Sequence, residues 1–377
     1  MGHSRAVPQP QQPDPYVGKE ILGGQFRVLE RIGSGGMGAV YKAHQPSMDR
    51  FVAVKILHAK FTHRKDLESR FRREARAMSH LTHPNTAKVF LYGQLDDRAF
   101  YIVMEHLEGR NLGQVVRATG PMNPERAVAI LVQACAALEE AHQKGIVHRD
   151  MKPENIFLCN QGGIKDFVKV LDFGLAKVTE REMRPGSLIL TQEGMVFGTP
   201  EFMSPEQAQG KILDARSDIY SLGVILYELL TGKLPFDART PMEHVTLHVQ
   251  ATPIPLDRRS PDRAFPPGLQ AVLDRALAKL PEQRYATALE FARALRSVVA
   301  LPNEPHLVGA PTDPPPRPLS VPAPSAASTI SEVTGPTLPG AMNRSIFDRA
   351  GPATALLVLA GVLLGFGIAA VALLVLR

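Results

Sequence analysis

The chain has 377 residues, of which 44% are hydrophobic, and its formal net charge is +6. This length and apolar content allow a large catalytic domain with a sizeable core and further segments beside it. A positive charge can suit nucleic acid, but no basic stripe interleaved with aromatic residues occurs, so nucleic-acid binding is not expected. The two cysteines, Cys135 and Cys159, are predicted to be buried free thiols in a reducing compartment, not a disulfide framework.

The first part of the chain changes from a polar lead-in to a strand pattern. Residues 1–22 are rich in Pro and Gln and lack the apolar core of a secretory signal, so a disordered segment is predicted. Residues 26–32 then alternate apolar and polar side chains, which is typical of a strand.

A glycine-rich segment follows this strand. Gly33, Gly35 and Gly38 have the spacing Gly-x-Gly-x-x-Gly, which lets backbone N–H groups approach phosphate oxygens closely. Dinucleotide-binding folds use the same spacing. In this chain, however, the glycines lead through Val40 to another strand and then to residues 52–55, not to a long helix. The pattern therefore favours a phosphate-binding hairpin.

A buried lysine and an acidic residue on the next helix form a predicted ion pair. Lys55 lies in an apolar strand, where an unpaired ammonium would be costly to bury. Residues 66–78 have helical periodicity, and Glu74 lies on the same face as Phe71 and Met78. Glu74 is therefore expected to pair with Lys55.

The middle of the chain carries the residues with the strongest chemical signal. Residues 100–107 read as a buried strand that runs into a connector, and residues 124–145 as a long amphipathic helix. In His-Arg-Asp-Met-Lys-Pro-Glu-Asn, Asp150 can accept the proton of an attacking hydroxyl and Lys152 can neutralise a phosphoryl group. Asn155 and Asp172, the latter after a short strand at 168–171, offer the hard oxygen ligands that Mg²⁺ prefers.

On these motifs the chain resembles the bacterial eukaryotic-like (Hanks-type) serine/threonine protein kinases, over about residues 26–299. The resemblance implies an α+β, two-lobed kinase fold at 23–300, with a small β-rich N-lobe and a larger helical C-lobe. It also implies ATP and Mg²⁺ as cofactors, Asp150 and Lys152 as catalytic residues, and Asn155 and Asp172 as metal ligands. The residues expected at the nucleotide are Ile32, Gly33, Ser34, Gly35, Gly36, Met37, Gly38, Ala39, Val40, Ala53, Lys55, Glu74, Met104 and Phe157, of which Ala53, Met104 and Phe157 would line the adenine pocket.

Further positions match the end of an activation segment at 198–206. By resemblance, Glu206 pairs with Arg284, and Asp218 holds the backbone of the catalytic loop. Lys152 together with Thr199 implies a serine or threonine acceptor, because the family associates that pairing with alcohol kinases.

The resemblance also implies regulation. Arg149, which precedes Asp150, implies a cationic pocket that needs a negative partner to order the activation segment. Thr191 is predicted to be autophosphorylated, and Glu193 to supply a fixed negative charge beside it. With Thr199, these form the predicted regulatory set.

Two departures from the family pattern stand out. The segment 160–166 is longer than expected and is predicted to be a hairpin tip without further role. Leu280 stands where Asp is usual, which is expected to loosen a helix cap but to leave Arg284 in place.

The C-terminal part has a different composition. Residues 301–350 form a Pro-rich linker, and residues 353–376, within a predicted transmembrane helix at 351–377, carry no charge. At 1.5 Å per residue this run spans about 36 Å, which exceeds a hydrocarbon core of about 30 Å. Arg344 and Arg349 before the run predict a single-pass, tail-anchored protein of the inner cell membrane with a cytoplasmic kinase domain and no external sensor. Small residues spaced four apart could permit a homodimer: Gly361, Gly365 and Ala369.

These features admit three functions. The favoured one is ATP-dependent phosphorylation of protein serine and threonine hydroxyls. A pseudokinase scaffold that binds partners at the membrane is the alternative, although every catalytic position is filled. A dinucleotide-binding enzyme is disfavoured by the strand that follows Val40.

Overall fold

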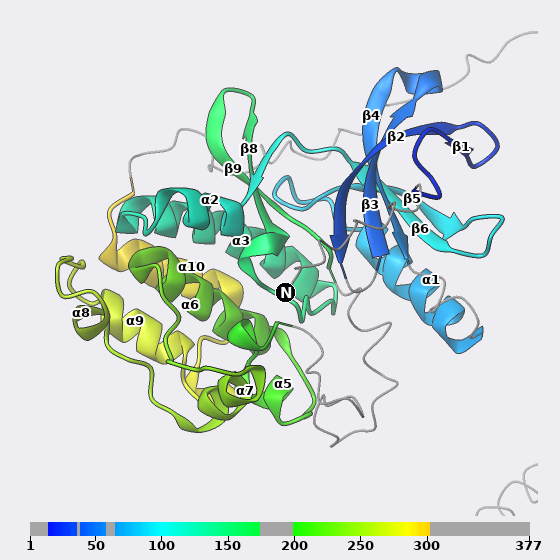
Figure 1. Cartoon of the computed structure of the whole chain (residues 1–377). Coiled ribbons are helices and arrows are strands. Elements are labelled where there is room, and N and C mark those ends of the chain that lie inside the picture. The colour runs from blue at the N-terminus through cyan, green and yellow to red at the C-terminus, as the bar shows by residue number, and fades with distance from the viewer. Residues whose placement is uncertain (1–13, 36–37, 58–64, 174–198, 302–377) are drawn as a thin grey trace, which may run out of the picture. The chain divides into compact units, whose positions relative to one another are not determined.

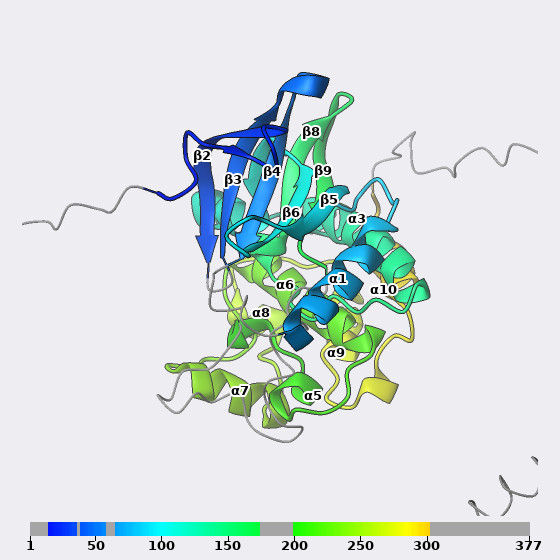
Figure 2. The same cartoon turned by 90° about the vertical axis from the view of Figure 1, so that its right-hand side faces the viewer.

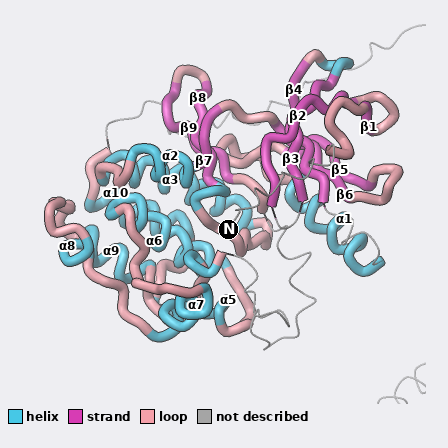
Figure 3. The backbone as a smooth tube through the Cα atoms, viewed as in Figure 1, coloured by secondary structure: helices cyan, strands magenta, loops and turns pink. Residues whose placement is uncertain are grey.

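The structure is a computed structural model that describes residues 14–35, 38–57, 65–173 and 199–301. Within this part of the chain, strands and one helix gather in one lobe and the remaining helices in the other, with a small sheet alongside those helices (Figure 1, Figure 3). The two-lobed α+β architecture implied by the resemblance is thereby confirmed.

The N-lobe is an antiparallel sheet with the strand order β1-β2-β3-β4-β6-β5. Alternating apolar residues give it a buried face, on which Val28, Val54 and Val103 are fully enclosed. The strands are β1 (Glu20–Ile21), β2 (Phe26–Gly35), β3 (Gly38–Gln45), β4 (Arg50–Leu57), β5 (Val89–Gln94) and β6 (Phe100–Glu105), with a 3-10 turn, η1 (Pro46–Met48), between β3 and β4.

One helix, α1 (Lys65–Ser79), accompanies this sheet (Figure 2). The ring of Phe71 stacks on Phe100 of β6 at a centroid distance of 4.7 Å. Met78 is also buried, as the helical periodicity of the sequence predicts. The helix therefore presents its apolar face, and with it Glu74, to the interior.

The C-lobe is built around two long helices that pack against each other, α3 (Pro124–Gln143) and α6 (Ala215–Thr231). Asn123 and Asp214 cap their N-termini, each accepting a hydrogen bond from a backbone N–H. The surrounding helices are α2 (Leu112–Thr119), α5 (Pro205–Ala208), α7 (Pro241–Gln250), α8 (Leu256–Arg259), α9 (Leu269–Ala276) and α10 (Ala288–Val298).

A small antiparallel sheet of β7 (Gly109–Asn111), β8 (Ile156–Gln161) and β9 (Ile164–Val170) connects the lobes. Val170 N–H donates to Asn85 C=O at 2.7 Å, and Ala87 N–H donates to Val170 C=O at 3.0 Å. Lys169 also pairs with Glu105 of β6 at 2.9 Å. The strand β9, which presents Asp172, is thus fixed to the chain that leads into the N-lobe.

The segment 160–166 forms the hairpin that the sequence predicts, with Gly162 and Gly163 at positive φ. It is not an inert tip, however. Asp166 accepts two hydrogen bonds from the guanidinium of Arg126 on α3, at 2.8 and 3.0 Å. The hairpin is therefore attached to the main C-lobe helix.

The predicted disordered N-terminal segment needs a correction at its C-terminal end. Tyr16 donates a hydrogen bond to Asp97 at 2.6 Å, and its ring meets Tyr41 edge-on. Asp14 pairs with Arg31 at 3.3 Å, and β1 pairs with β2. Residues 14–22 are ordered because aromatic and ionic contacts hold them to the sheet, and the composition of the lead-in did not reveal this.

The linker and the predicted transmembrane helix at 351–377 lie outside the described residues. Among the helices that the structure does describe, none combines the length and the apolar character that a membrane crossing requires.

Candidate active site

Four predicted side chains meet at the catalytic loop. Lys152 Nζ donates to Asp150 Oδ2 at 2.7 Å and to Thr199 Oγ1 at 3.3 Å. Asn155 Nδ2 donates to the backbone carbonyl of Asp150 at 2.6 Å and to its Oδ2 at 3.3 Å. Asn155 belongs to a 3-10 turn, η3 (Pro153–Asn155), that leads directly into β8. The Lys152 ammonium thus links the Asp150 carboxylate to the hydroxyl of Thr199.

A buried carboxylate accepts hydrogen bonds from the backbone of this loop. Asp218, in the first turn of α6, accepts hydrogen bonds at 2.8 Å from the backbone N–H groups of His148 and Arg149. Its Oδ2 also lies 2.7 Å from His142 Nε2. Burial alone would raise the pKa of Asp218, but His142 and these donors hold it below its usual range. The role that the resemblance implies for Asp218 is therefore present in the geometry.

Asp172 stands where β9 ends, in a left-handed backbone conformation with φ of 57°. Leu171 N–H donates to the Asn155 carbonyl at 2.9 Å, and the Leu171 carbonyl accepts from His148 Nε2 at 2.7 Å. The two predicted metal ligands, Asn155 and Asp172, are therefore held on neighbouring backbone segments.

The ammonium of Lys55 lies 2.8 Å from Asp172 Oδ2. Burial opposes ionisation of Asp172, but this ammonium outweighs it and keeps the pKa of Asp172 below its usual range. Lys55 itself is 8% exposed, so the cation that the sequence places in an apolar strand is compensated by a carboxylate.

The predicted ion pair between Lys55 and Glu74 is not seen among the described contacts. Glu74 does lie on the interior face of α1, at 9% exposed, and its carboxylate lies 3.4 Å from Arg73 Nη2. Helical periodicity identifies the face on which a residue lies, but not its distance from a particular strand residue. Asp172 is a carboxylate that reaches Lys55, and the pairing of Glu74 with Lys55 stays a prediction.

The described glycines of the glycine-rich segment lie at the paired ends of β2 and β3, where Gly33 lies opposite Val40 and Gly35 opposite Gly38. A Cβ at Gly38 would lie 2.1 Å from the Ile56 carbonyl oxygen, so no other residue fits there. Val40 is in turn the register partner of Lys55 on β4. The structure describes Ile32, Ser34 and Ala39 in these strands, whereas Gly36 and Met37 lie outside the described residues.

Two of the three residues expected at the adenine are neighbours across strands: Ala53 of β4 lies opposite Met104 of β6. Phe157 lies on β8, opposite Asn111 and Lys169. Met104 and Asp172 also line one small cavity, whose other walls are mostly apolar and include Met78, Ile102 and Phe173. The end of β6 and the start of the segment after β9 therefore border a common space.

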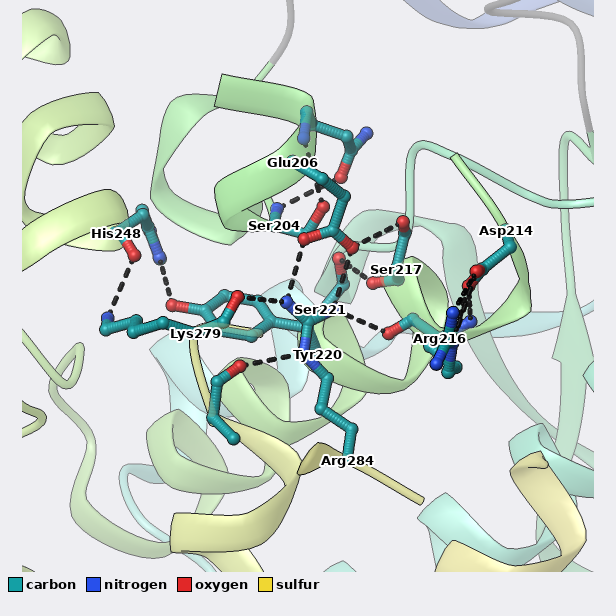
Figure 4. A network of polar contacts seen from close by, with 12 residues as sticks. Ser204, Glu206, Asp214, Arg216, Ser217, Tyr220, Ser221, His248, Lys279 and Arg284 are labelled. Atoms are coloured by element: carbon teal, nitrogen blue, oxygen red, sulfur yellow. Dashed lines mark hydrogen bonds and ion pairs between the residues drawn. The ribbon is translucent and has the colours of Figure 1, made fainter. Parts of the chain in front are cut away.

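A second polar cluster holds the segment that carries Thr199 (Figure 4). Arg284 and Glu206 form two parallel hydrogen bonds at 2.7 Å, as the resemblance implies. Arg284 also donates to three backbone carbonyls, so all five of its N–H groups are used: Ala278, Arg216 and Lys279. Leu280 supplies no side-chain cap to the 3-10 turn η5 (Pro281–Gln283), but Arg284 keeps its place, as predicted.

Sequence reasoning missed some residues of this cluster. Gln207 donates to the Arg149 carbonyl at 2.6 Å and also caps α5, so it joins the catalytic loop to the segment with Thr199. His248 of α7 is fully buried and contacts Tyr220 and the backbone of Glu201. Neither has a motif around it that would have identified it. Of the predicted regulatory residues, Thr199 is placed beside Lys152, whereas Thr191 and Glu193 lie outside the described residues.

The donor set fits a divalent cation that is shared with a phosphate group. Because Asn155 directs its nitrogen to Asp150, its Oδ1 remains as a ligand, and Asp172 adds a carboxylate that is ionised at neutral pH. Mg²⁺ is usually held by one or two carboxylates together with substrate phosphates, not by a cage made of protein alone. Asn155 and Asp172 are therefore suitable ligands for it.

Comparison with known proteins gives a consistent result. The protein kinase domain family matches residues 26–295. Serine/threonine-protein kinase pkn3 of Myxococcus xanthus is 42% identical over 334 residues, which cover 87% of this chain and 59% of that protein. PrkC of Bacillus subtilis is 40% identical over 74% of this chain and 41% of its own length. The chain therefore spans less than two thirds of these curated relatives.

Among solved structures, the kinase domain of PknI from Mycobacterium tuberculosis is similar, with a TM-score of 0.57 and 26% sequence identity. The match covers 75% of this chain and 98% of that domain.

Proposed function

Because the chain belongs to the protein kinase family, within the bacterial Hanks-type serine/threonine kinases, we propose that it transfers the γ-phosphoryl group of ATP to serine and threonine hydroxyls of proteins. The observation that carries this proposal is the contact of Lys152 with both Asp150 and Thr199. It brings a base, a cation and the edge of an acceptor segment together at one point. Every catalytic position is filled, and nothing in the site favours the pseudokinase alternative.

Each residue has a role that follows from its place. Asp150 would orient the acceptor hydroxyl and accept its proton. Lys152, at 2.7 Å from Asp150, would stabilise the charge on the moving phosphoryl group. Most of the rate enhancement would come from positioning and electrostatics, since phosphoryl transfer needs no covalent step on the protein.

ATP and Mg²⁺ are the proposed cofactors. Lys55 and the backbone of the glycine-rich strand ends at Gly33, Gly35 and Gly38 would hold the phosphates, and Asn155 and Asp172 would hold the metal. When bound, the metal would neutralise phosphate charge and fix the orientation of the leaving group.

The acceptor specificity can be tested directly. The chain would be incubated with Mg²⁺ and γ-labelled ATP, with myelin basic protein as acceptor, and the labelled product hydrolysed to its amino acids. Phosphoserine and phosphothreonine are expected. Label found in phosphotyrosine alone would reject the proposed specificity.

Control by the activation segment is a separate proposal. Arg149 directly precedes the catalytic base, and its backbone is held by Asp218 and Gln207. A phosphate on Thr191, with Glu193 beside it, would pair with the guanidinium of Arg149 and order the activation segment. Thr191→Ala should lower activity toward the acceptor, whereas Thr191→Asp should retain part of it. Undiminished activity of Thr191→Ala would refute this control.

We also propose that residues 351–377 anchor the protein in the inner cell membrane as a single-pass helix, with the kinase domain in the cytoplasm. The support is the uncharged run and the arginines before it. Chain expressed in bacteria should stay with membranes after a carbonate wash, and a variant ending at residue 300 should not. The small residues of the run could further allow a homodimer, which a bilayer association assay of residues 350–377 would detect.

A further inference from the structure

The segment Thr199–Ser204, here called the acceptor loop, borders the catalytic site and is fastened from several sides. It contains the 3-10 turn η4 (Pro200–Phe202). Lys152 donates to the Thr199 hydroxyl at 3.3 Å. Ser221 of α6 donates to the Phe202 carbonyl at 2.8 Å. In the middle of the loop, the Glu201 carbonyl is contacted by His248, a residue of α7.

His248 is completely buried and has a partner at each ring nitrogen. Nε2 lies 2.9 Å from the Glu201 carbonyl oxygen. Nδ1 lies 2.9 Å from the Tyr220 hydroxyl, a contact that Figure 4 shows. A carbonyl can only accept, so Nε2 must carry a hydrogen. Burial lowers the pKa of His248 to about 3, so the ring is neutral, Nδ1 accepts, and the Tyr220 hydroxyl donates. The tautomer is therefore fixed by the two partners.

Helix α7 is also held at His248 by contacts from Lys279 and Phe236. Lys279 Nζ donates to the His248 carbonyl at 2.9 Å and lies 4.6 Å from the ring centroid of Phe236. Phe236 packs edge-on against the His248 imidazole at 5.0 Å. The imidazole thus has little freedom to rotate, and its N–H points at a fixed position in the acceptor loop.

We propose that His248 is a positioning residue for the protein acceptor: its Nε2–H fixes the acceptor loop at Glu201 and so sets where the acceptor chain lies relative to Asp150. This inference rests on the proposed function. It predicts that the loss of this one hydrogen bond weakens acceptor binding while ATP binding stays unchanged, since Lys55 and the glycine-rich strand ends are on the other lobe.

Two substitutions distinguish the contributions of the two ring nitrogens of His248. Glutamine extends its amide nitrogen as far along the side chain as Nε2, so His248→Gln can still donate to Glu201. Asparagine reaches only as far as Nδ1, so His248→Asn can meet Tyr220 but leaves the Glu201 carbonyl without its donor. His244→Gln, one turn earlier on α7, is the matched control, because it makes the same chemical change at a ring whose buried Nδ1 has no hydrogen-bond partner among the described residues.

The experiment measures KM for myelin basic protein, KM for ATP and kcat on the full chain. His248→Asn should raise the acceptor KM about tenfold, as expected for a buried acceptor deprived of its donor. KM for ATP should change by less than about twofold, and His248→Gln and His244→Gln should behave like wild type. Equal impairment of His248→Asn and His248→Gln, or an unchanged acceptor KM in His248→Asn, would overturn the inference.

Hydrogen exchange provides a readout that does not need activity. Amides of the acceptor loop should exchange faster in His248→Asn than in His248→Gln, while amides of α3 keep wild-type protection. Equal exchange in the two variants would contradict the positioning role. If the wild type transfers no phosphate, the proposed function fails, and the exchange comparison alone then decides this inference.

Discussion

The carboxylate of Asp218 accepts a hydrogen bond from the backbone N–H of Arg149 at 2.8 Å, so a buried side chain of α6 sets the position of the residue before the catalytic base. The same carboxylate holds His148 N–H at 2.8 Å. The catalytic loop is therefore shaped by a charge that is itself buried.

Asp218→Asn should disturb this arrangement, because the amide places a donor among N–H groups that need acceptors. We expect kcat to fall about 100-fold, the effect of a small misplacement of a catalytic group, with KM for ATP nearly unchanged. Asp166→Asn makes the same change at the pair with Arg126, away from the loop, and should keep wild-type kcat. Equal kcat in the two variants would argue against the role of Asp218.

The buried pair of Glu206 and Arg284 should dominate local stability. Arg284 is 2% exposed, and its replacement by Ala leaves the Glu206 carboxylate buried without its cation. We expect a loss of about 3–5 kcal/mol in the free energy of unfolding, measured by urea denaturation. Arg216→Ala removes a more exposed pair with Asp214 and should cost less than about 1 kcal/mol.

Glu228 of α6 should make stability depend on pH in an unusual direction. Burial, with Glu154 next in effect, raises its pKa to about 7, and its Oε2 has no hydrogen-bond partner among the described residues. A carboxyl group whose pKa is raised by folding stabilises the folded state while that group is protonated. This contribution is complete below the ordinary pKa of 4.5 and is lost as pH rises through about 7.

Glu228→Gln removes that dependence. The Tm of the variant minus that of wild type should therefore be larger at about pH 8.5 than at about pH 5. Glu108→Gln, an exposed acid on the connector after β6, should show no such trend. A constant difference for Glu228→Gln across this range would show that the carboxyl is not perturbed.

Lys55 should affect nucleotide use more than folding. Lys55→Met leaves Asp172 without its ammonium and removes a cation from the expected phosphate site. We expect kcat/KM for ATP to fall about 100-fold or more. Lys42→Met, on the neighbouring strand β3, is the control and should stay within about twofold of wild type. Similar losses in both variants would point to a general defect of the sheet.

The catalytic loop could be predicted from the sequence because its residues are close together along the chain. Asp150, Lys152 and Asn155 fall within six residues, and a local motif fixes their mutual geometry. The Glu206–Arg284 pair joins distant segments, and it could be predicted only by resemblance.

Contacts without a local pattern could not be predicted. The contact of Lys55 with Asp172 depends on how β9 approaches β4, which periodicity does not determine. His248 stands in an ordinary amphipathic helix, and its burial depends on packing against Tyr220 and Phe236. Residues 14–22 likewise gain order from Asp97 and Tyr41, which are far along the chain.

The most direct test of the account is phosphotransfer from Mg·ATP by wild type and Asp150→Asn, measured as label incorporated into myelin basic protein. Asp150 Oδ2 accepts from Lys152 and Asn155, so the isosteric amide keeps the shape of the site but loses the proton acceptor. The account predicts ready incorporation by wild type and a decrease of at least about 100-fold in Asp150→Asn, with both proteins binding ATP equally. Equal incorporation by the two proteins, or none by either, would contradict it.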